Sequence, residues 1–252
     1  MGRWAGGPIA VAKRGDLLVV MDASAESSVD ELGSDVLSDL RAVSSFLKFP
    51  LDTRLLVDAT TTGQASRVDE LGSGDAAAVT YPVVATHDGE TTGIAGWRIK
   101  INPDNVATTL LQPGLLRHEL THFVLRNVNV GNPTWLVEGV AEVSGYWPAQ
   151  FEDQVVADSY YHRLMRAPHR LPETPYWSNN PDMNYQIGRA AVDYLVLTYG
   201  VERLVTFMRS YRTRFAAPDV DANTKRLLTK VYGTTEERVM TGAFRLLAEF
   251  NH

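Results

Sequence analysis

Apolar and polar positions in the first sixty residues follow two periods, one typical of strands and one typical of a helix. Residues 16–21 (DLLVVM) and 54–59 (RLLVDA) are short apolar runs, which predicts two largely buried strands. Between them, residues 26–48 place apolar side chains three and four positions apart, and Pro50 closes the pattern. The pattern therefore predicts a long amphipathic helix between two strands.

A hairpin is predicted next. Residues 76–86 and 92–101 have strand-like patterns and flank the tetrapeptide 87–90 (HDGE), in which an Asp-Gly pair is a strong signal for a two-residue hairpin turn. Residues 60–74 are rich in Thr, Ser and Gly, which predicts a surface loop. We expect the first half of the chain to be mixed α and β, with a mainly antiparallel sheet.

From Ala107 onward the apolar spacing is almost wholly helical. No internal repeat, low-complexity tract or break in composition divides the chain, so we predict one α+β domain over residues 1–252. Its α/β part covers residues 1–106 and its helical part residues 107–252. After two helices around residues 115–142, further helices are predicted at 150–165, 185–199, 201–211, 224–231 and 235–250, with a loop at 168–181 and breaks at Gly200, Pro218 and Gly233.

Composition narrows the function classes. The chain of 252 residues carries a net charge of −6 and scattered basic residues, which argues against binding to a nucleic-acid backbone. It contains no cysteine, so disulfides, thiolate metal clusters and cysteine nucleophiles are excluded. No run approaches the roughly 18 consecutive apolar residues of a membrane span. Histidine and carboxylate side chains remain as the available metal ligands.

The pentapeptide HELTH at residues 118–122 carries the strongest chemical signal. On a helix, His118 and His122 lie one turn apart on the same face, so both imidazoles can bind one divalent metal ion. Glu119 lies on the neighbouring face, where its carboxylate can reach a water on that metal and act as a general base. Pro113 and Gly114 suit a first helical turn before this motif.

A catalytic zinc site needs a third protein ligand and one open position. The segment WLVEGVAE at residues 135–142 follows after a short loop, and Glu138 is its candidate ligand. Glu142 lies one turn further on the same face, where it can accept a hydrogen bond from a ligand histidine. A solvated histidine pair on a helix surface is the alternative for HELTH alone, but the second segment at this distance favours a metal site.

HELTH followed by WLVEGVAE resembles the gluzincin metallopeptidases, especially the bacterial peptidase-MA-like domains. The resemblance extends over the helical segment 185–211 and more loosely over the whole chain. It implies a zincin-like fold with an active-site cleft between the two halves, one Zn²⁺ ion, and a peptide or protein substrate. It also implies roles for four residues, with zinc bound by His118, His122 and Glu138 and with Glu119 as general base.

A hydrogen-bond donor beyond the metal usually stabilises the oxyanion of peptide hydrolysis. Tyr185 is our candidate, because it is predicted to begin the helix that follows the long loop. Half-buried packing is the alternative for a tyrosine in this position. Rival donors are Tyr146, Tyr160, Tyr161 and His162, whereas His87, His169 and His252 have no expected role.

The resemblance also places a strand that binds extended substrate before the HELTH helix, and residues 96–101 (GWRIKI) occupy that place. They are either an exposed edge that pairs with peptide or an ordinary paired hairpin strand. Aminopeptidase relatives carry an acidic residue beside this strand, but residues 93–101 contain no Asp or Glu. The departure favours cleavage of internal peptide bonds.

Two other functions remain open. One is an inactive zinc-binding scaffold or recognition domain of the bacterial cell envelope, against which the presence of Glu119 speaks. The other is a zinc enzyme that hydrolyses a non-peptide amide or ester. Residues 1–11 lack a secretory signal, which leaves a cytosolic protein or one with an anchor or signal upstream. The resemblance favours an extracytoplasmic location, in the envelope or secreted, and the sequence does not determine an oligomeric state.

Overall fold

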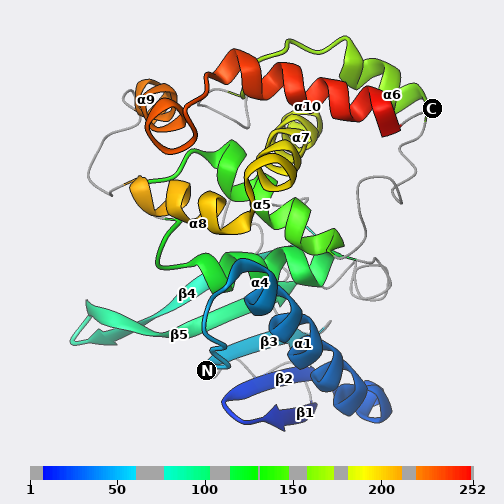
Figure 1. The fold of residues 1–252 in the computed structure, drawn as a ribbon. Coiled ribbons are helices and arrows are strands. Elements are labelled where there is room, and N and C mark those ends of the chain that lie inside the picture. The colour runs from blue at the N-terminus through cyan, green and yellow to red at the C-terminus, as the bar shows by residue number, and fades with distance from the viewer. Residues whose placement is uncertain are drawn as a thin grey trace. The chain divides into compact units, whose positions relative to one another are not determined.

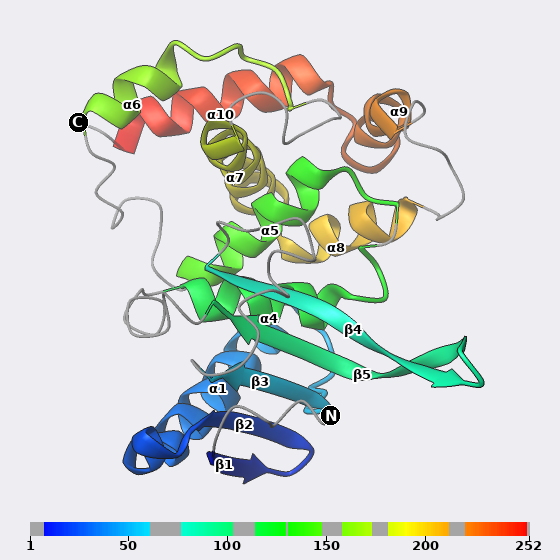
Figure 2. The same cartoon turned by 180° about the vertical axis from the view of Figure 1, so that it is seen from behind.

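The computed structural model describes residues 8–60, 77–102, 114–129, 131–147, 158–172, 181–211 and 220–250, with the backbone alone at 158–161, 181 and 250. The chain divides into two compact units, Met1–Ser45 with Phe49–Val124 and Phe46–Lys48 with Leu125–His252. Figures 1 and 2 show the helices and strands from two opposite sides. The division falls inside the helix that carries HELTH, so most of that helix groups with the sheet, whereas the sequence placed the boundary after residue 106.

The first unit contains one five-stranded sheet in the order β1-β2-β3-β5-β4. The β1–β2 and β4–β5 pairs are antiparallel, whereas β3 is parallel to both β2 and β5. The expected mainly antiparallel sheet is therefore corrected to a mixed sheet with a parallel centre. The strands are β1 (Ile9–Arg14), β2 (Leu17–Asp22), β3 (Leu55–Ala59), β4 (Ala78–His87) and β5 (Glu90–Ile101).

The parallel pairing of β2 with β3 follows from the helix α1 (Glu26–Leu47), which joins these two strands. A crossover helix returns the chain to the starting end of the sheet, so the next strand runs in the same direction. The predicted helix and its two flanking strands are confirmed, but β1 was not predicted. One side of α1 is buried through seven apolar side chains: Val29, Leu32, Val36, Leu40, Val43, Phe46 and Leu47.

The β4–β5 hairpin is confirmed with its Asp-Gly turn. Asp88 and Gly89 have φ angles of 50° and 83°, the left-handed pair that a tight hairpin turn requires. The prediction that β5 could be an exposed edge is wrong, because Trp97–Lys100 pairs with β3 on one side and with β4 on the other. Among the described strands β4 is the edge on this side, and Pro82 within it suits that position.

The second unit is helical in its described part. The helix α7 (Pro181–Tyr199) makes its most extensive contacts with α5 (Thr134–Tyr146), and it also packs against α10, α8 and α6. Figures 1 and 2 both show α7 crossing α5. The other helices are α6 (Asp158–Met165), α8 (Val201–Ser210), α9 (Val220–Tyr232) and α10 (Glu236–Phe250).

The predicted helices of this half are confirmed where the structure describes them, with shifted ends. The shift that matters for the site is at α7, which begins at Pro181 and places Tyr185 in its second turn rather than at its start. Parts of the predictions at residues 60–74, 107–113, 150–157 and 168–181, and the break at Pro218, lie outside the described residues. No helix in the described part of the chain is long and apolar enough to cross a membrane.

Candidate metal centre

The helix α4 (Leu115–Leu125) carries HELTH and is held by its apolar side. Leu120, Phe123 and Leu125 are fully buried, which orients the opposite side of the helix. Gly114 precedes the helix with a φ of 93°, and its carbonyl accepts the hydrogen bond from the amide of His118 at 2.8 Å. The histidine pair therefore begins in the first turn of a helix anchored by its core residues.

The two imidazoles of α4 converge. The Nε2 atoms of His118 and His122 are 3.1 Å apart, and the ring planes are inclined at 75°. Two nitrogens bound tetrahedrally to one zinc ion at about 2.05 Å would lie about 3.3 Å apart. The observed separation therefore fits two ligands of one metal ion with almost no movement of the rings.

Glu138 on α5 completes the donor set. Ligand atoms of His118, His122 and Glu138 all lie within 4.8 Å of one another, with the first residue buried and the other two half-buried. These three residues could hold a metal ion, as the sequence predicted. Imidazole and carboxylate ligands suit zinc and also other divalent transition metals. The three residues therefore form a candidate metal group whose ion the ligand types do not identify.

Glu119 is buried, with 6% of its surface exposed, and its carboxylate contacts a hydroxyl that the sequence analysis did not single out. Thr80 Oγ1 on β4 lies 2.6 Å from Glu119 Oε2 and 3.0 Å from the backbone carbonyl of the same residue. The two residues are 39 positions apart in the chain, so only the placement of α4 against the sheet brings them together.

A second polar contact ties α4 within its unit. Arg117 Nε donates a hydrogen bond to Asp39 Oδ1 on α1 at 2.6 Å. Arg117 directly precedes the first histidine, so this ion pair and the Thr80 contact hold the same turn of α4 from two neighbouring elements. The first turn of the HELTH helix is thus fixed by charge pairing as well as by apolar packing.

Charged side chains also meet between α5 and α7. Arg189 Nε lies 3.7 Å from Asp193 Oδ2, and its guanidinium carbon lies 4.4 Å from the centre of the Tyr146 ring. Asp193 Oδ2 is buried although 18% of the side chain is exposed. Burial raises the pKa of Asp193 to about 7, with Arg189 opposing the shift and Glu142 adding to it. The charge of Glu142 therefore acts on Asp193, while the role of Glu142 beside a metal ligand stays a prediction.

The oxyanion donor stays a prediction. Tyr185 is half-buried in α7, and its predicted position at the start of that helix is wrong. Among its rivals, Tyr146 faces Arg189 and His162 is exposed, while the side chains of Tyr160 and Tyr161 lie outside the description.

The remaining histidines lie apart from the metal group in the part of the chain that is described. His87 is exposed in the hairpin turn, 3.5 Å from the Asp88 carboxylate. His169 stacks on Phe244 with ring centres 3.8 Å apart, and His252 is not described. Within the described residues, one group of three histidine and carboxylate side chains has its possible ligand atoms within 4.8 Å of one another. It consists of His118, His122 and Glu138.

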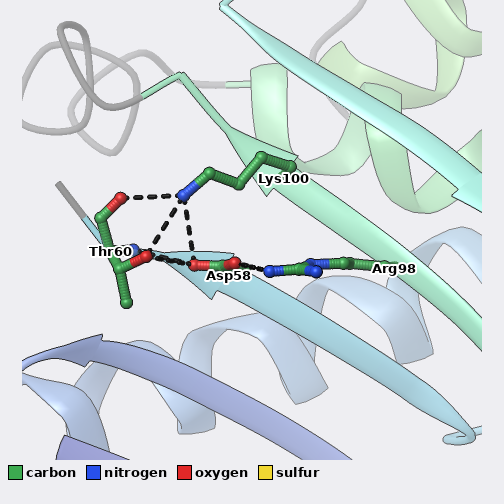
Figure 3. A network of polar contacts seen from close by, with 4 residues as sticks. All are labelled: Asp58, Thr60, Arg98 and Lys100. Carbon is green, nitrogen blue, oxygen red and sulfur yellow. Dashed lines mark hydrogen bonds and ion pairs between the residues drawn. The ribbon is translucent and has the colours of Figure 1, made fainter. Parts of the chain in front are cut away.

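Figure 3 shows a buried ionic cluster on β3 and β5 that the sequence analysis missed. Asp58 accepts hydrogen bonds from Arg98 and Lys100, and Lys100 Nζ also donates to the Thr60 carbonyl at 2.8 Å. All four residues are at most 9% exposed. Burial and the neighbouring Arg98 lower the pKa of Lys100 to about 8, against the opposing effect of Asp22.

This cluster is separate from the metal group. Side chains alternate between the two faces of a strand, and directly paired residues share a face. Lys100 pairs with Asp58, whereas Ile99 pairs with Thr80. Thr80 and the Glu119 carboxylate that it contacts therefore lie on the opposite face of the sheet from the cluster.

Comparisons of the chain with protein-family models, with curated proteins and with solved structures find no match. The chemistry of the site therefore rests on the residues and their geometry.

Proposed function

We propose that the protein is a zinc-dependent metallopeptidase of the gluzincin type with a zincin-like fold. The observation that carries the proposal is the convergence of the ligand atoms of His118, His122 and Glu138 within 4.8 Å. Two imidazoles and one carboxylate leave one position open on a tetrahedral zinc ion, which is typical of catalytic rather than structural sites.

A zinc ion held there would polarise the substrate carbonyl and lower the pKa of a bound water toward 7. Glu119 would act as the general base that takes a proton from the attacking water. It would return that proton to the leaving amine nitrogen as the carbon–nitrogen bond breaks, so that the carboxylate ends the cycle ionised. The burial of Glu119 supports this role, because a general base works best where few waters compete for its proton.

We also propose that the enzyme cleaves internal peptide bonds. The edge strand β4, rather than β5, is the strand that can add an extended substrate by backbone pairing. Its ten residues, AVTYPVVATH, contain no Asp or Glu. An endopeptidase needs no carboxylate to hold a free amino end of its substrate. The absence of Asp and Glu noted for residues 93–101 of β5 also holds for β4.

Metal analysis and a protein-digestion assay test the proposal together. The purified chain should contain about one zinc per molecule by mass spectrometry, and it should cleave an unfolded protein mixture until a chelator removes the metal. Glu119→Gln should keep the zinc but lower cleavage at least about 100-fold, as expected for loss of a general base. Glu31→Gln, the same change at an exposed glutamate of α1, is the matched control and should alter neither quantity.

Each other outcome has a defined meaning. Bound zinc with no cleavage of any protein or peptide would replace the enzyme by a metal-binding scaffold. Zinc-dependent hydrolysis of simple esters or amides, without peptide cleavage, would assign a non-peptide substrate. Absence of any divalent metal at the three ligands, in protein never exposed to a chelator, would overturn the site itself.

A further inference from the structure

The hydroxyl of Thr80 touches both ends of the Glu119 residue, its carboxylate and its backbone carbonyl. The distances are 2.6 Å to Oε2 and 3.0 Å to the carbonyl oxygen. Thr80 belongs to the edge strand β4 and is half-buried, whereas Glu119 is buried on α4. A short hydrogen bond to an ionised oxygen is of the stronger, charge-assisted kind.

We propose that Thr80 is a positioning residue for Glu119, holding Oε2 so that Oε1 is the oxygen presented for proton transfer. The inference rests on the proposed peptidase function, and it adds a residue that neither the motif nor its spacing contains. A glutamate side chain has three rotatable bonds, and ordering such a side chain costs conformational entropy. A fixed donor on a strand removes much of that disorder before the substrate binds.

The chemistry of a hydroxyl suits this position. Threonine has one donor hydrogen and two acceptor lone pairs, so its hydrogen can point to Oε2 at 2.6 Å or to the backbone carbonyl oxygen at 3.0 Å. Both acceptors belong to Glu119, so either direction of the hydroxyl ties that residue to β4.

Thr80 also connects the strand proposed for substrate to the residue proposed for catalysis. Its side chain leaves β4 toward α4, whereas its backbone belongs to the edge strand of the sheet. Substrate that pairs with β4 would therefore bind one residue's backbone while the same residue's side chain fixes the base. A substitution at Thr80 that removes only the hydroxyl should lower turnover and leave substrate affinity unchanged.

The test compares Thr80→Val, which keeps the branched shape, with Thr80→Ser, which keeps the hydroxyl. On zinc-loaded protein, Thr80→Val should lower kcat about 10- to 100-fold, the size expected for a lost hydrogen bond to a charged group, with KM and zinc content unchanged. Thr80→Ser should restore most of the turnover. Thr241→Val, the same change at an exposed position of α10, is the matched control and should behave as the wild type.

A second measurement does not depend on activity. The melting temperature is compared for wild type, Thr80→Val, Glu119→Ala and the double variant, since coupled residues give non-additive changes. Thr80→Val should lower the melting temperature more when Glu119 is present, because the buried carboxylate then loses its donor.

The outcomes separate this inference from the function on which it rests. Wild-type turnover in Thr80→Val, or equal losses in Thr80→Val and Thr80→Ser, would overturn the positioning role while leaving the peptidase proposal intact. A wild-type protein that binds zinc but hydrolyses nothing would overturn the peptidase proposal. In that case the melting temperatures of the four proteins would test the contact between Thr80 and Glu119 without any activity. Additive changes in melting temperature would overturn it.

Discussion

Glu142 lies one helical turn beyond Glu138 on α5, and its charge reaches Asp193 on α7. A carboxylate in this position does not bind the metal but can orient a ligand ring and keep its lone pair directed at the ion. The same carboxylate contributes to the raised pKa of Asp193. The predicted role of Glu142 would therefore make one side chain, at the residue scale, a link between the metal group and the contact of α5 with α7.

Glu142→Ala should weaken zinc affinity about 10- to 100-fold without abolishing binding, as expected for the loss of a group that orients a ligand. A competition titration against a chromophoric chelator measures the change. Glu31→Ala, an exposed position on α1, is the control. Wild-type affinity in Glu142→Ala would show that the residue has no part in the site.

Asp193 should make the stability of the helical unit depend on pH. Its pKa rises from 3.8 in the unfolded reference to about 7 in the fold, so folding takes up a proton between these values. The stabilising contribution is complete below about pH 4 and is lost as the pH rises through about 7.

The melting temperature of Asp193→Asn minus that of the wild type should therefore increase as the pH rises from about 5 to about 8. The reason is that an amide keeps the shape of the side chain but does not ionise. Thermal unfolding across this range measures the difference. Asp35→Asn, exposed on α1, should show a constant difference. A gap between Asp193→Asn and wild type that stays flat with pH would contradict the assignment.

At the scale of elements, α5 and α7 approach each other through two glycines. A Cβ on Gly139 would lie 2.6 Å from the Gly188 carbonyl oxygen, and one on Gly188 would lie 2.7 Å from the Trp135 carbonyl oxygen. Both obstacles are backbone atoms, which cannot turn aside as a side chain can. The close packing of α5, which carries Glu138, against α7 therefore requires glycine at both positions.

Gly139→Ala should lower the free energy of unfolding by about 1–3 kcal/mol, the usual cost of overpacking a tight contact. Urea denaturation measures it. The matched control is Gly96→Ala on β5, where an added Cβ meets no atom within 4 Å. Equal stability of the two variants would mean that α5 and α7 can separate without cost.

At the scale of the whole molecule, the described chain forms a mixed sheet unit and a helical unit, each with its own buried apolar side chains. The order of the strands decides which backbone can meet a substrate. Because Trp97–Lys100 of β5 pairs with both β3 and β4, the outer pairing positions beside these residues belong to β4 among the described strands. That strand offers backbone groups and no carboxylate.

A peptide substrate with an acetylated amino end should be cleaved at nearly the same kcat/KM as the same peptide with a free amino end. The reason is that no carboxylate on β4 pairs with an α-amino group, and an unpaired ammonium beside a divalent cation is unfavourable. Mass spectrometry of the products locates the cleaved bond in both peptides. A large loss on acetylation would instead assign an aminopeptidase.

Features that depend on neighbours in the chain were predictable. The pairing of His118 with His122 follows from the helical period alone, and the Asp-Gly turn follows from the left-handed conformation that Gly and Asp tolerate. The long helix α1 and the strands beside it follow from the spacing of apolar residues. For the same reason Glu138 could be proposed as the third ligand, since a short loop limits how far it can lie from the histidines.

Features that join distant segments were decided by the tertiary structure. The interior place of β5 and the parallel pairing of β3 depend on how strands order themselves in the sheet, which alternation along one strand does not encode. Arg98 and Lys100 look like solvent-exposed positions in the sequence, yet they are buried because Asp58, about forty residues away, compensates their charge.

The contact between Thr80 and Glu119 is the clearest case. HELTH by itself determined that His118 and His122 can bind one metal ion together, because a helix repeats every 3.6 residues whatever surrounds it. Which group holds the carboxylate of Glu119 depended on packing α4 against one face of the sheet, with Thr80 on that face by the register of β4. Hydrogen bonds act only over about 3 Å, so a partner 39 residues away can be found only once the chain has folded.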